Sequence, residues 1–201
     1  MGVDQGDTLT ITIGLASLDR LFVVHLEETE MWDRLDFLMD QFGIRYCVID
    51  ALPNKHSAKS FAAKYPGRVA IQYFQGKEYK TNFELFENKI NVQTVQVDRT
   101  TSIDSMIDRF EQGKIVIPNR RKVEGKALQS LEDFRRHCKN LVAKIEETPL
   151  GTLKKTYLSG RVENHYGMSL NSCVISAFEL GMGNSGPMVM PVFGNNIVGN
   201  A

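Results

Sequence analysis

The sequence predicts an α/β fold with a mixed five-stranded central sheet, in which three antiparallel strands precede parallel strands and helices cover both faces. Three observations lead to this fold class. Residues 8–13 alternate strictly between threonine and apolar residues, as in a half-buried strand, and residues 21–26 form the next strand-like segment. Residues 44–49 are continuously apolar, which is typical of a buried parallel strand. The amphipathic helix expected between these last two segments supplies the crossover that parallel pairing requires.

The remaining elements follow from turn and capping residues. A first strand ends at Asp4, and the first helix is expected to begin after Thr29 as its cap and to end at Gly43. The later elements are expected in this order: a short helix over 53–63, a strand over 69–74, an insertion or hairpin over 75–90, a strand over 92–97, a helix over 101–112, a small strand over 115–117, a long amphipathic helix over 128–145, a short strand over 156–158 and a final helix over 164–180.

Composition limits the domain organisation and the class of protein. The chain has 201 residues, of which 42% are hydrophobic, so it can form one good core. We expect one domain over residues 1–181 and an extended or disordered tail over 182–201, which is rich in Gly, Asn, Met and Pro. The three cysteines lack the spacing of a zinc site or a disulfide framework. No segment is apolar enough to span a bilayer, and a start directly on a strand suggests a domain cut from a longer chain.

Two aspartates stand at the ends of strands that this topology makes neighbours. Asp4 ends the first strand, and Asp50 ends the apolar run over 44–49. An aspartate at a strand end often serves only as a turn residue, but two at adjacent strand ends repel each other unless a cation lies between them. Carboxylate oxygens suit Mg²⁺ or Mn²⁺. The pattern therefore predicts a two-metal site for phosphodiester hydrolysis, with Asp4 as the bridging ligand.

Four segments in order resemble the nuclease domain of tailed-bacteriophage large terminases. They are Gly-Val-Asp-Gln-Gly-Asp-Thr over 2–8, Cys-Val-Ile-Asp-Ala-Leu-Pro-Asn over 47–54, Val-Gln-Val-Asp-Arg-Thr over 95–100 and Asn-His-Tyr-Gly-Met-Ser-Leu-Asn over 164–171. The resemblance implies a ribonuclease-H/RuvC-like fold and endonucleolytic cutting of concatemeric double-stranded DNA during packaging. It also implies a packaging ATPase domain on the same parent chain, portal and small-terminase partners, and action in the host cytoplasm while docked on the procapsid. No phosphate-binding loop of the Gly-x-x-x-x-Gly-Lys-Ser/Thr type occurs here, so the motor itself is absent from this chain.

The third metal ligand is where the sequence departs from that family. Relatives usually have an aspartate before the histidine at the start of the last helix, and Asn164 takes that place here. An amide oxygen brings no charge, and Asn164 also suits a helix N-cap. His165 is an equal candidate, particularly for Mn²⁺, and Glu163 is a third. The predicted site is therefore Asp4 and Asp50 with His165 or Asn164.

Basic residues are expected to hold DNA by its phosphates rather than by base contacts. The candidates are Arg120, Arg121 and Lys122, with Arg99 as a phosphate contact or salt-bridge partner. The same basic stretch also fits a solvated face balanced by acids such as Glu132 and Asp133.

Several rival functions fit parts of the pattern. A Holliday-junction resolvase or transposase core would share the chemistry, and a non-catalytic DNA-binding module would explain the missing third aspartate. An actin-like or sugar-kinase ATPase shares the sheet, but it needs a second lobe and a second phosphate loop. No serine or cysteine has a partnered base at recognisable spacing, which disfavours covalent catalysis. His25 and His137 are interpreted as packing or surface residues.

Overall fold

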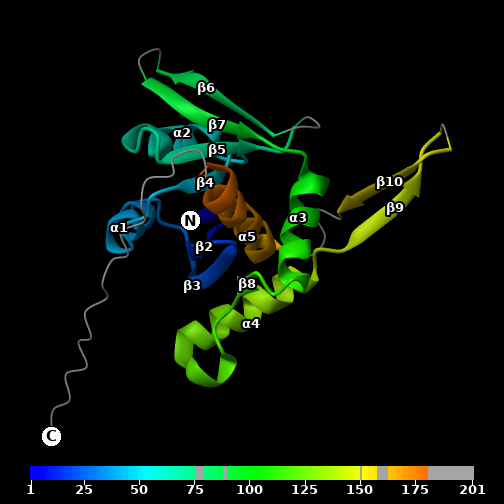
Figure 1. Cartoon of the computed structure of the whole chain (residues 1–201). Helices are drawn as coiled ribbons and strands as arrows, with labels where there is room; N and C mark the ends of the chain where they lie inside the picture. The colour runs from blue at the N-terminus through cyan, green and yellow to red at the C-terminus, as the bar shows by residue number, and fades with distance from the viewer. Residues whose placement is uncertain (76–78, 88–89, 150, 158–162, 181–201) are drawn as a thin grey trace, which may run out of the picture.

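A computed structural model describes residues 1–75, 79–87, 90–149, 151–157 and 163–180 of the chain (Figure 1). Within these residues, eight strands form one sheet in the order β6-β7-β5-β4-β1-β2-β3-β8. The strands are β1 (Gly2–Gln5), β2 (Leu9–Ser17), β3 (Arg20–Thr29), β4 (Cys47–Asp50), β5 (Val69–Tyr73), β6 (Lys80–Phe86), β7 (Ile90–Gln96) and β8 (Ile115–Val116). The tail expected over 182–201 lies outside the described residues.

The predicted five-stranded sheet forms the centre of a larger one. β1, β2 and β3 pair antiparallel, and β4 and β5 continue from β1 in parallel. The prediction of five strands was wrong, because the sheet has eight in the described part of the chain. β7 extends it parallel to β5 and carries β6 as its hairpin partner, while β8 adds to β3 at the opposite edge. Part of the missing count came from residues 75–90, which were expected as an insertion or hairpin but not as a sheet strand.

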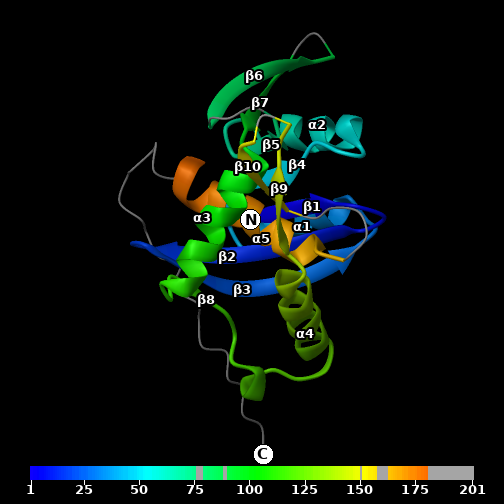
Figure 2. The same cartoon turned by 90° about the vertical axis from the view of Figure 1, so that its right-hand side faces the viewer.

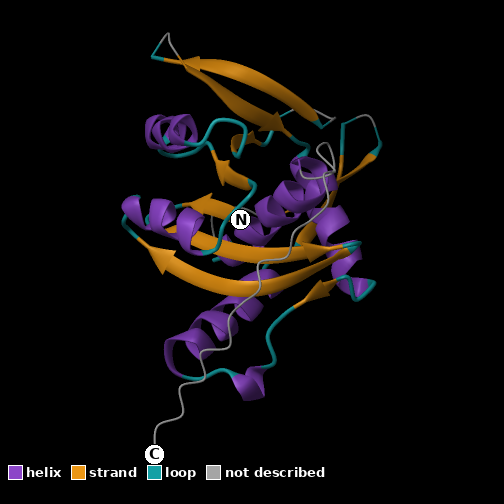
Figure 3. Cartoon of the chain, turned by 60° about the vertical axis from the view of Figure 1, so that its left-hand side comes forward, coloured by secondary structure: helices purple, strands orange, loops and turns teal. Residues whose placement is uncertain are grey.

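Helices cover both faces of the sheet, as predicted (Figure 3). α1 (Asp33–Gln41) and α2 (Lys55–Lys64) pack on one face, where Leu35, Leu38 and Phe61 join the apolar side chains of the central strands. The other face carries α3 (Arg99–Glu111), α4 (Gly125–Lys139) and α5 (His165–Ile175), and α5 continues as the π-helix η2 (Ser176–Leu180). None of the described helices combines the length and the apolar character needed to cross a membrane.

Two local predictions were wrong for identifiable reasons. The helix expected over 128–145 ends at Lys139, and residues 143–147 instead form β9 (Ala143–Glu147), which pairs with β10 (Leu153–Tyr157) in a ribbon that projects from the body (Figure 1). The apolar spacing runs on past Lys139, but Val142 and Ile145 are exposed and meet no buried surface. Thr29 does not cap the first helix, because β3 runs through it and α1 begins only at Asp33.

Candidate functional site

The parallel pairing of β1 and β4 brings the two predicted aspartates side by side. Gly2 pairs with Val48 and Val3 with Ile49, so the next position along each strand holds Asp4 and Asp50. Side chains alternate between the faces of a strand, and Val3 and Ile49 belong to the core beneath α1 and α2. Asp4 and Asp50 therefore share the opposite face, which is the face covered by α5. The predicted convergence of the two carboxylates at one rim of the sheet is present.

A glycine fixes how close α5 comes to β1. A Cβ on Gly2 would lie 2.0 Å from the carbonyl oxygen of Ser169 and 2.2 Å from the backbone nitrogen of Cys173, so no other residue fits there without displacing the helix. Asp4 lies two residues further along the strand, and His165 lies one helical turn before Ser169. These two steps are of similar length, so the start of α5 comes to rest over Asp4. The Nδ1 of His165 is 2.7 Å from a carboxylate oxygen of Asp4.

Burial makes both carboxylates difficult to ionise. Burial raises the pKa of Asp4, and the hydrogen bond from His165 opposes this rise. Burial and then the charge of Asp4 raise the pKa of Asp50 from 3.8 to about 6. A negative charge on Asp4 can raise the pKa of Asp50 only if the two carboxylates lie close together. The hydrogen bond to Asp4 in turn raises the pKa of His165.

Arg99 is the predicted basic residue whose charge acts on this site. It begins α3, and its guanidinium donates a hydrogen bond to the carbonyl oxygen of Tyr157 at 3.0 Å. Burial lowers the pKa of Arg99, while the charges of Asp4 and Asp50 oppose that change. The preceding residue, Asp98, has a structural role, because it caps α3 by accepting a hydrogen bond from the backbone N–H of Thr101 at 2.7 Å.

The three third-ligand candidates have different surroundings. His165 bonds to Asp4, whereas Glu163 is exposed and forms an ion pair with Arg136. Asn164 stands at the N-cap position of α5, as predicted, but its side chain makes no capping hydrogen bond. Its amide group is therefore not committed to the helix terminus.

The donor set fits a divalent cation in chemistry but is incomplete as a cage. Asp4 and Asp50 offer neighbouring carboxylate oxygens that disfavour each other's charge, which a cation would relieve. Among the described residues, however, no three His, Cys, Asp or Glu side chains are grouped closely enough to hold a metal ion. Asp4 and Asp50 are adjacent, but His165, one candidate for the third ligand, is hydrogen-bonded to Asp4.

Gln5 is part of the site and was not predicted. Its side-chain amide donates to the carbonyl oxygen of Asp50, and its side-chain oxygen accepts a hydrogen bond from the backbone N–H of Asn54 at 3.2 Å. Gln5 thereby ties the end of β1 to the turn that follows Asp50. Its position next to Asp4 was the only signal in the sequence, and the partners became evident only from the strand register.

The other predicted DNA contacts form no hydrogen bond or ion pair with the two carboxylates among the described residues. Arg120, Arg121 and Lys122 form the 3-10 helix η1 (Arg120–Lys122), which precedes α4. Arg120 forms an ion pair of 2.6 Å with Glu132 on α4. The alternative interpretation, a solvated basic face balanced by acids, therefore holds for Arg120 and also for Arg136, which pairs with Asp133 at 2.9 Å.

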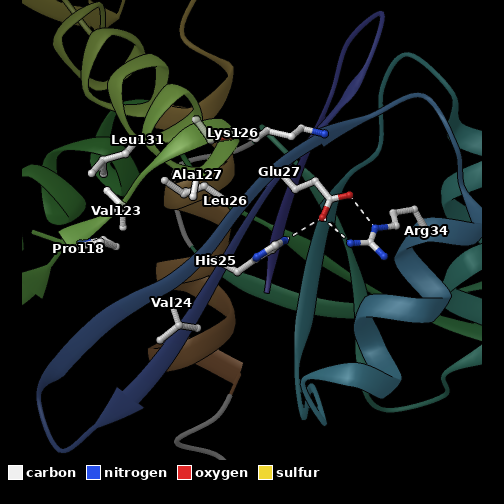
Figure 4. Close-up of a pocket in the computed structure, with 11 residues that line it drawn as sticks. Val24, His25, Leu26, Glu27, Arg34, Pro118, Val123, Lys126, Ala127 and Leu131 are labelled. Carbon is white, nitrogen blue, oxygen red and sulfur yellow. Dashed lines mark hydrogen bonds and ion pairs between the residues drawn. The ribbon is translucent and has the colours of Figure 1, made fainter. Parts of the chain in front are cut away.

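A hollow beside α4 does not involve the carboxylate pair. It lies between β3 and α4 and is mainly apolar, with Val24, Leu26 and Leu131 among its lining residues (Figure 4). His25 bonds to Glu27 at 2.8 Å, and Arg34 completes the ion-pair group. The expectation that His25 is a packing or surface residue fits this setting. His137 is buried beside Tyr166, which also fits the expectation for that residue.

Comparison with known proteins adds little evidence about the family or function of this chain. No family model matches the chain, and no curated protein matches it. Among solved structures, the large terminase nuclease from thermophilic phage G20c aligns with a TM-score of 0.42 and 16% sequence identity, over 84% of this chain and 88% of that chain. A likeness this weak carries no conclusion about fold or function, so the case for a function rests on the residues themselves.

Proposed function

We propose that this chain is a divalent-metal-dependent DNA endonuclease domain of the ribonuclease-H-like class, belonging to a viral genome-packaging terminase. The observation that carries the proposal is the placement of Asp4 and Asp50 on adjacent parallel strands, on the face crossed by α5. The order of the five central strands supports the fold assignment, because it is the order expected for that class.

Asp4 and Asp50 would hold the cations, Mg²⁺ or Mn²⁺, with Asp4 as the shared ligand. When bound, two such ions supply an acidified water as the attacking group and stabilise the departing 3′ oxygen. The protein's own contribution is to keep both carboxylates at one rim. Gln5 fixes the backbone at Asp50, and Gly2 allows α5 to close over Asp4.

His165 or Asn164 would complete the site from the start of α5. His165 already engages Asp4, so it can either ligate a cation or hold the Asp4 carboxylate in position. Asn164 has no capping bond to give up, which leaves its amide oxygen available as a neutral donor. The positive charge of Arg99 partly offsets the negative charges of Asp4 and Asp50.

The substrate and partners proposed for this domain follow from the family that the sequence resembles. The substrate is concatemeric double-stranded DNA, delivered by a packaging ATPase domain of the same parent chain. Portal and small terminase subunits would be its partners, with the assembly docked on a procapsid in the host cytoplasm.

Cutting of supercoiled plasmid in Mg²⁺ or Mn²⁺ tests the proposal. Asp4→Asn and Asp50→Asn should each reduce the rate by at least about 100-fold, since metal ligation contributes several kcal/mol of transition-state stabilisation. Asp7→Asn is the matched control, because Asp7 is exposed and only three residues from Asp4. No cutting by the natural sequence in either metal, or equal rates in all variants, would refute the nuclease assignment.

One observation favours a second candidate, a DNA-binding module whose site has decayed. His165 is hydrogen-bonded to Asp4, and no third carboxylate joins Asp4 and Asp50 within the described residues. DNA retention without cutting in either metal would favour this candidate. ATP hydrolysis without cutting would instead support the actin-like alternative.

A further inference from the structure

A basic hollow lies between η1 and the exposed side of α4. It is open, has a volume of about 320 Å³ and is lined by Arg120, Glu132, Arg135, Arg136, Lys139 and Asn140. Four of these six residues are cationic and one is acidic. We call this group the α4 cleft. Its charge contrasts with the net charge of zero of the whole chain.

Acidic side chains neutralise only half of the cations in the α4 cleft. Arg120 pairs with Glu132, and Arg136 pairs with Asp133 and Glu163. Within the described part of the chain, Arg135 and Lys139 form no ion pair of 4.0 Å or less. They lie four residues apart on α4, so they present their charges side by side on one exposed face.

The α4 cleft is directly linked to the start of α5. Asn140 donates a hydrogen bond to the carbonyl oxygen of Glu163 at 2.8 Å, and Arg136 holds the Glu163 side chain. Two residues later, His165 bonds to Asp4. In Figure 2, a loop joins the short helix at the bottom of the view, η1, to the first turn of α4, and the last turn of α4 lies near α5. A polyanion bound along α4 would therefore reach the rim where the two carboxylates meet.

We propose that the α4 cleft binds the phosphate backbone of duplex DNA and that Glu163 occupies the phosphate position on Arg136 in the free protein. Arginine suits this task, because its guanidinium forms paired hydrogen bonds with phosphate as it does with carboxylate. DNA binding then exchanges the Glu163 carboxylate for a phosphate and adds Arg135 and Lys139 as new contacts. This inference rests on the proposed function, since it takes DNA as the ligand.

Fluorescence anisotropy with a short labelled DNA duplex tests the cleft. The measurement is made in EDTA over a series of salt concentrations, so that neither metal binding nor cutting contributes. The double variant Arg135→Gln/Lys139→Gln should bind about tenfold more weakly at low salt. Its slope of log K against log salt should be shallower by about 2, because each phosphate contact contributes about 0.9.

The matched control is Lys80→Gln/Lys126→Gln, which removes two exposed charges from β6 and from the other side of α4. It should change the slope by less than half as much. An equal loss of affinity in the two double variants, or no DNA binding by the unchanged chain, would overturn the proposal. Thermal unfolding of each variant verifies that the fold is intact.

Glu163→Gln supplies a test of opposite sign. Removing the competing carboxylate should tighten DNA binding about threefold in EDTA, whereas Asp133→Gln, which leaves Glu163 on Arg136, should have a smaller effect. Weaker or unchanged binding in Glu163→Gln would refute the exchange. If the cleft variants bind DNA as tightly as the natural chain, the plasmid-cutting result is unaffected. If the plasmid is not cut, the binding result in EDTA is unaffected. The two hypotheses can therefore be refuted separately.

Discussion

The two charged regions of this molecule meet at the start of α5 but differ in burial. At the rim of β1 and β4, Asp4 is only 7% exposed, and burial is the largest cause of its raised pKa. In the α4 cleft, Arg135, Arg136 and Lys139 are exposed. The same unit charge therefore has very different consequences in the two places, because water screens the second region and not the first.

This difference separates two tasks. A buried pair of like charges stores an unfavourable energy that a bound cation can relieve, so the rim is suited to bind a small, highly charged ion. An exposed row of cations has little effect on stability but attracts a long polyanion through many weak, salt-dependent contacts. The following predictions test this contrast, from the largest expected effect to the smallest.

Removing the close approach of α5 should disrupt the rim most strongly. Gly2→Ala places a Cβ against two backbone atoms of α5, which cannot move aside as a flexible side chain could. We expect a loss of about 3 kcal/mol or more in the free energy of unfolding, measured by urea denaturation. Gly67→Ala is the control: its Cβ would meet nothing within 4 Å, and its φ of +73° should cost about 1–2 kcal/mol. Equal losses in the two variants would contradict the packing that positions His165 over Asp4.

Neutralising Asp50 should stabilise the cation-free protein at neutral pH. The folded-state pKa of about 6 exceeds the ordinary value of 3.8, so ionisation disfavours folding. The stabilising contribution of the protonated carboxyl is complete below about pH 4 and is lost as the pH rises through about 6. In EDTA, Asp50→Asn should therefore match the natural chain at low pH and exceed its unfolding free energy by roughly 3 kcal/mol above pH 7.

Adding Mn²⁺ should reverse that ranking. A cation that binds only the folded natural chain stabilises it by about 4.1 kcal/mol at a thousandfold excess over Kd, which exceeds the deficit of roughly 3 kcal/mol, while Asp50→Asn should gain much less. A stability difference that is independent of both pH and Mn²⁺ would show that the two carboxylates do not act as a pair.

Replacing Arg99 should raise the pKa of Asp50 by an amount that depends little on the salt concentration. Arg99 is half-buried, and its charge favours the ionised forms of Asp4 and Asp50. In Arg99→Gln, the pKa of Asp50 measured by carboxyl NMR should therefore rise further, by a few tenths to about one pH unit. Arg109→Gln, which removes a guanidinium stacked on Phe178, should leave that pKa unchanged. A similar shift in both variants would assign the effect to net charge rather than to position.

The acidic rim could be predicted from the sequence because each aspartate directly follows a recognisable strand pattern. Asp4 and Asp50 each end a strand whose apolar pattern is visible, and standard topology makes those strands adjacent. Gln5, by contrast, acts through the carbonyl of Asp50 and the backbone of Asn54, which are partners that only the strand register reveals. The engagement of His165 with Asp4 likewise depends on the depth to which α5 sinks onto Gly2.

The basic region was harder to predict because helical spacing and burial disagree there. The apolar repeat of α4 continues through Leu141, Val142 and Ile145, yet the helix stops at Lys139 and a strand follows. Periodicity specifies a face but not whether another element covers it. The DNA contacts were expected at Arg120, Arg121 and Lys122, whereas most residues of the α4 cleft come from the last turns of α4.

The smallest expected effect comes from an exposed ion pair in the α4 cleft. Arg120 lies 2.6 Å from Glu132, but its side chain is 65% exposed, so hydration and side-chain entropy offset most of the attraction. Arg120→Gln should change the free energy of unfolding by less than about 1 kcal/mol, and the change should shrink further in high salt. Urea denaturation at low and high salt measures it, with Arg121→Gln as a neighbouring control that breaks no ion pair within the described residues. A salt-independent change of roughly 3 kcal/mol, the size expected for Asp50→Asn, would remove the contrast between the two regions, because it would mean that the charges of the cleft are screened no better than those of the rim.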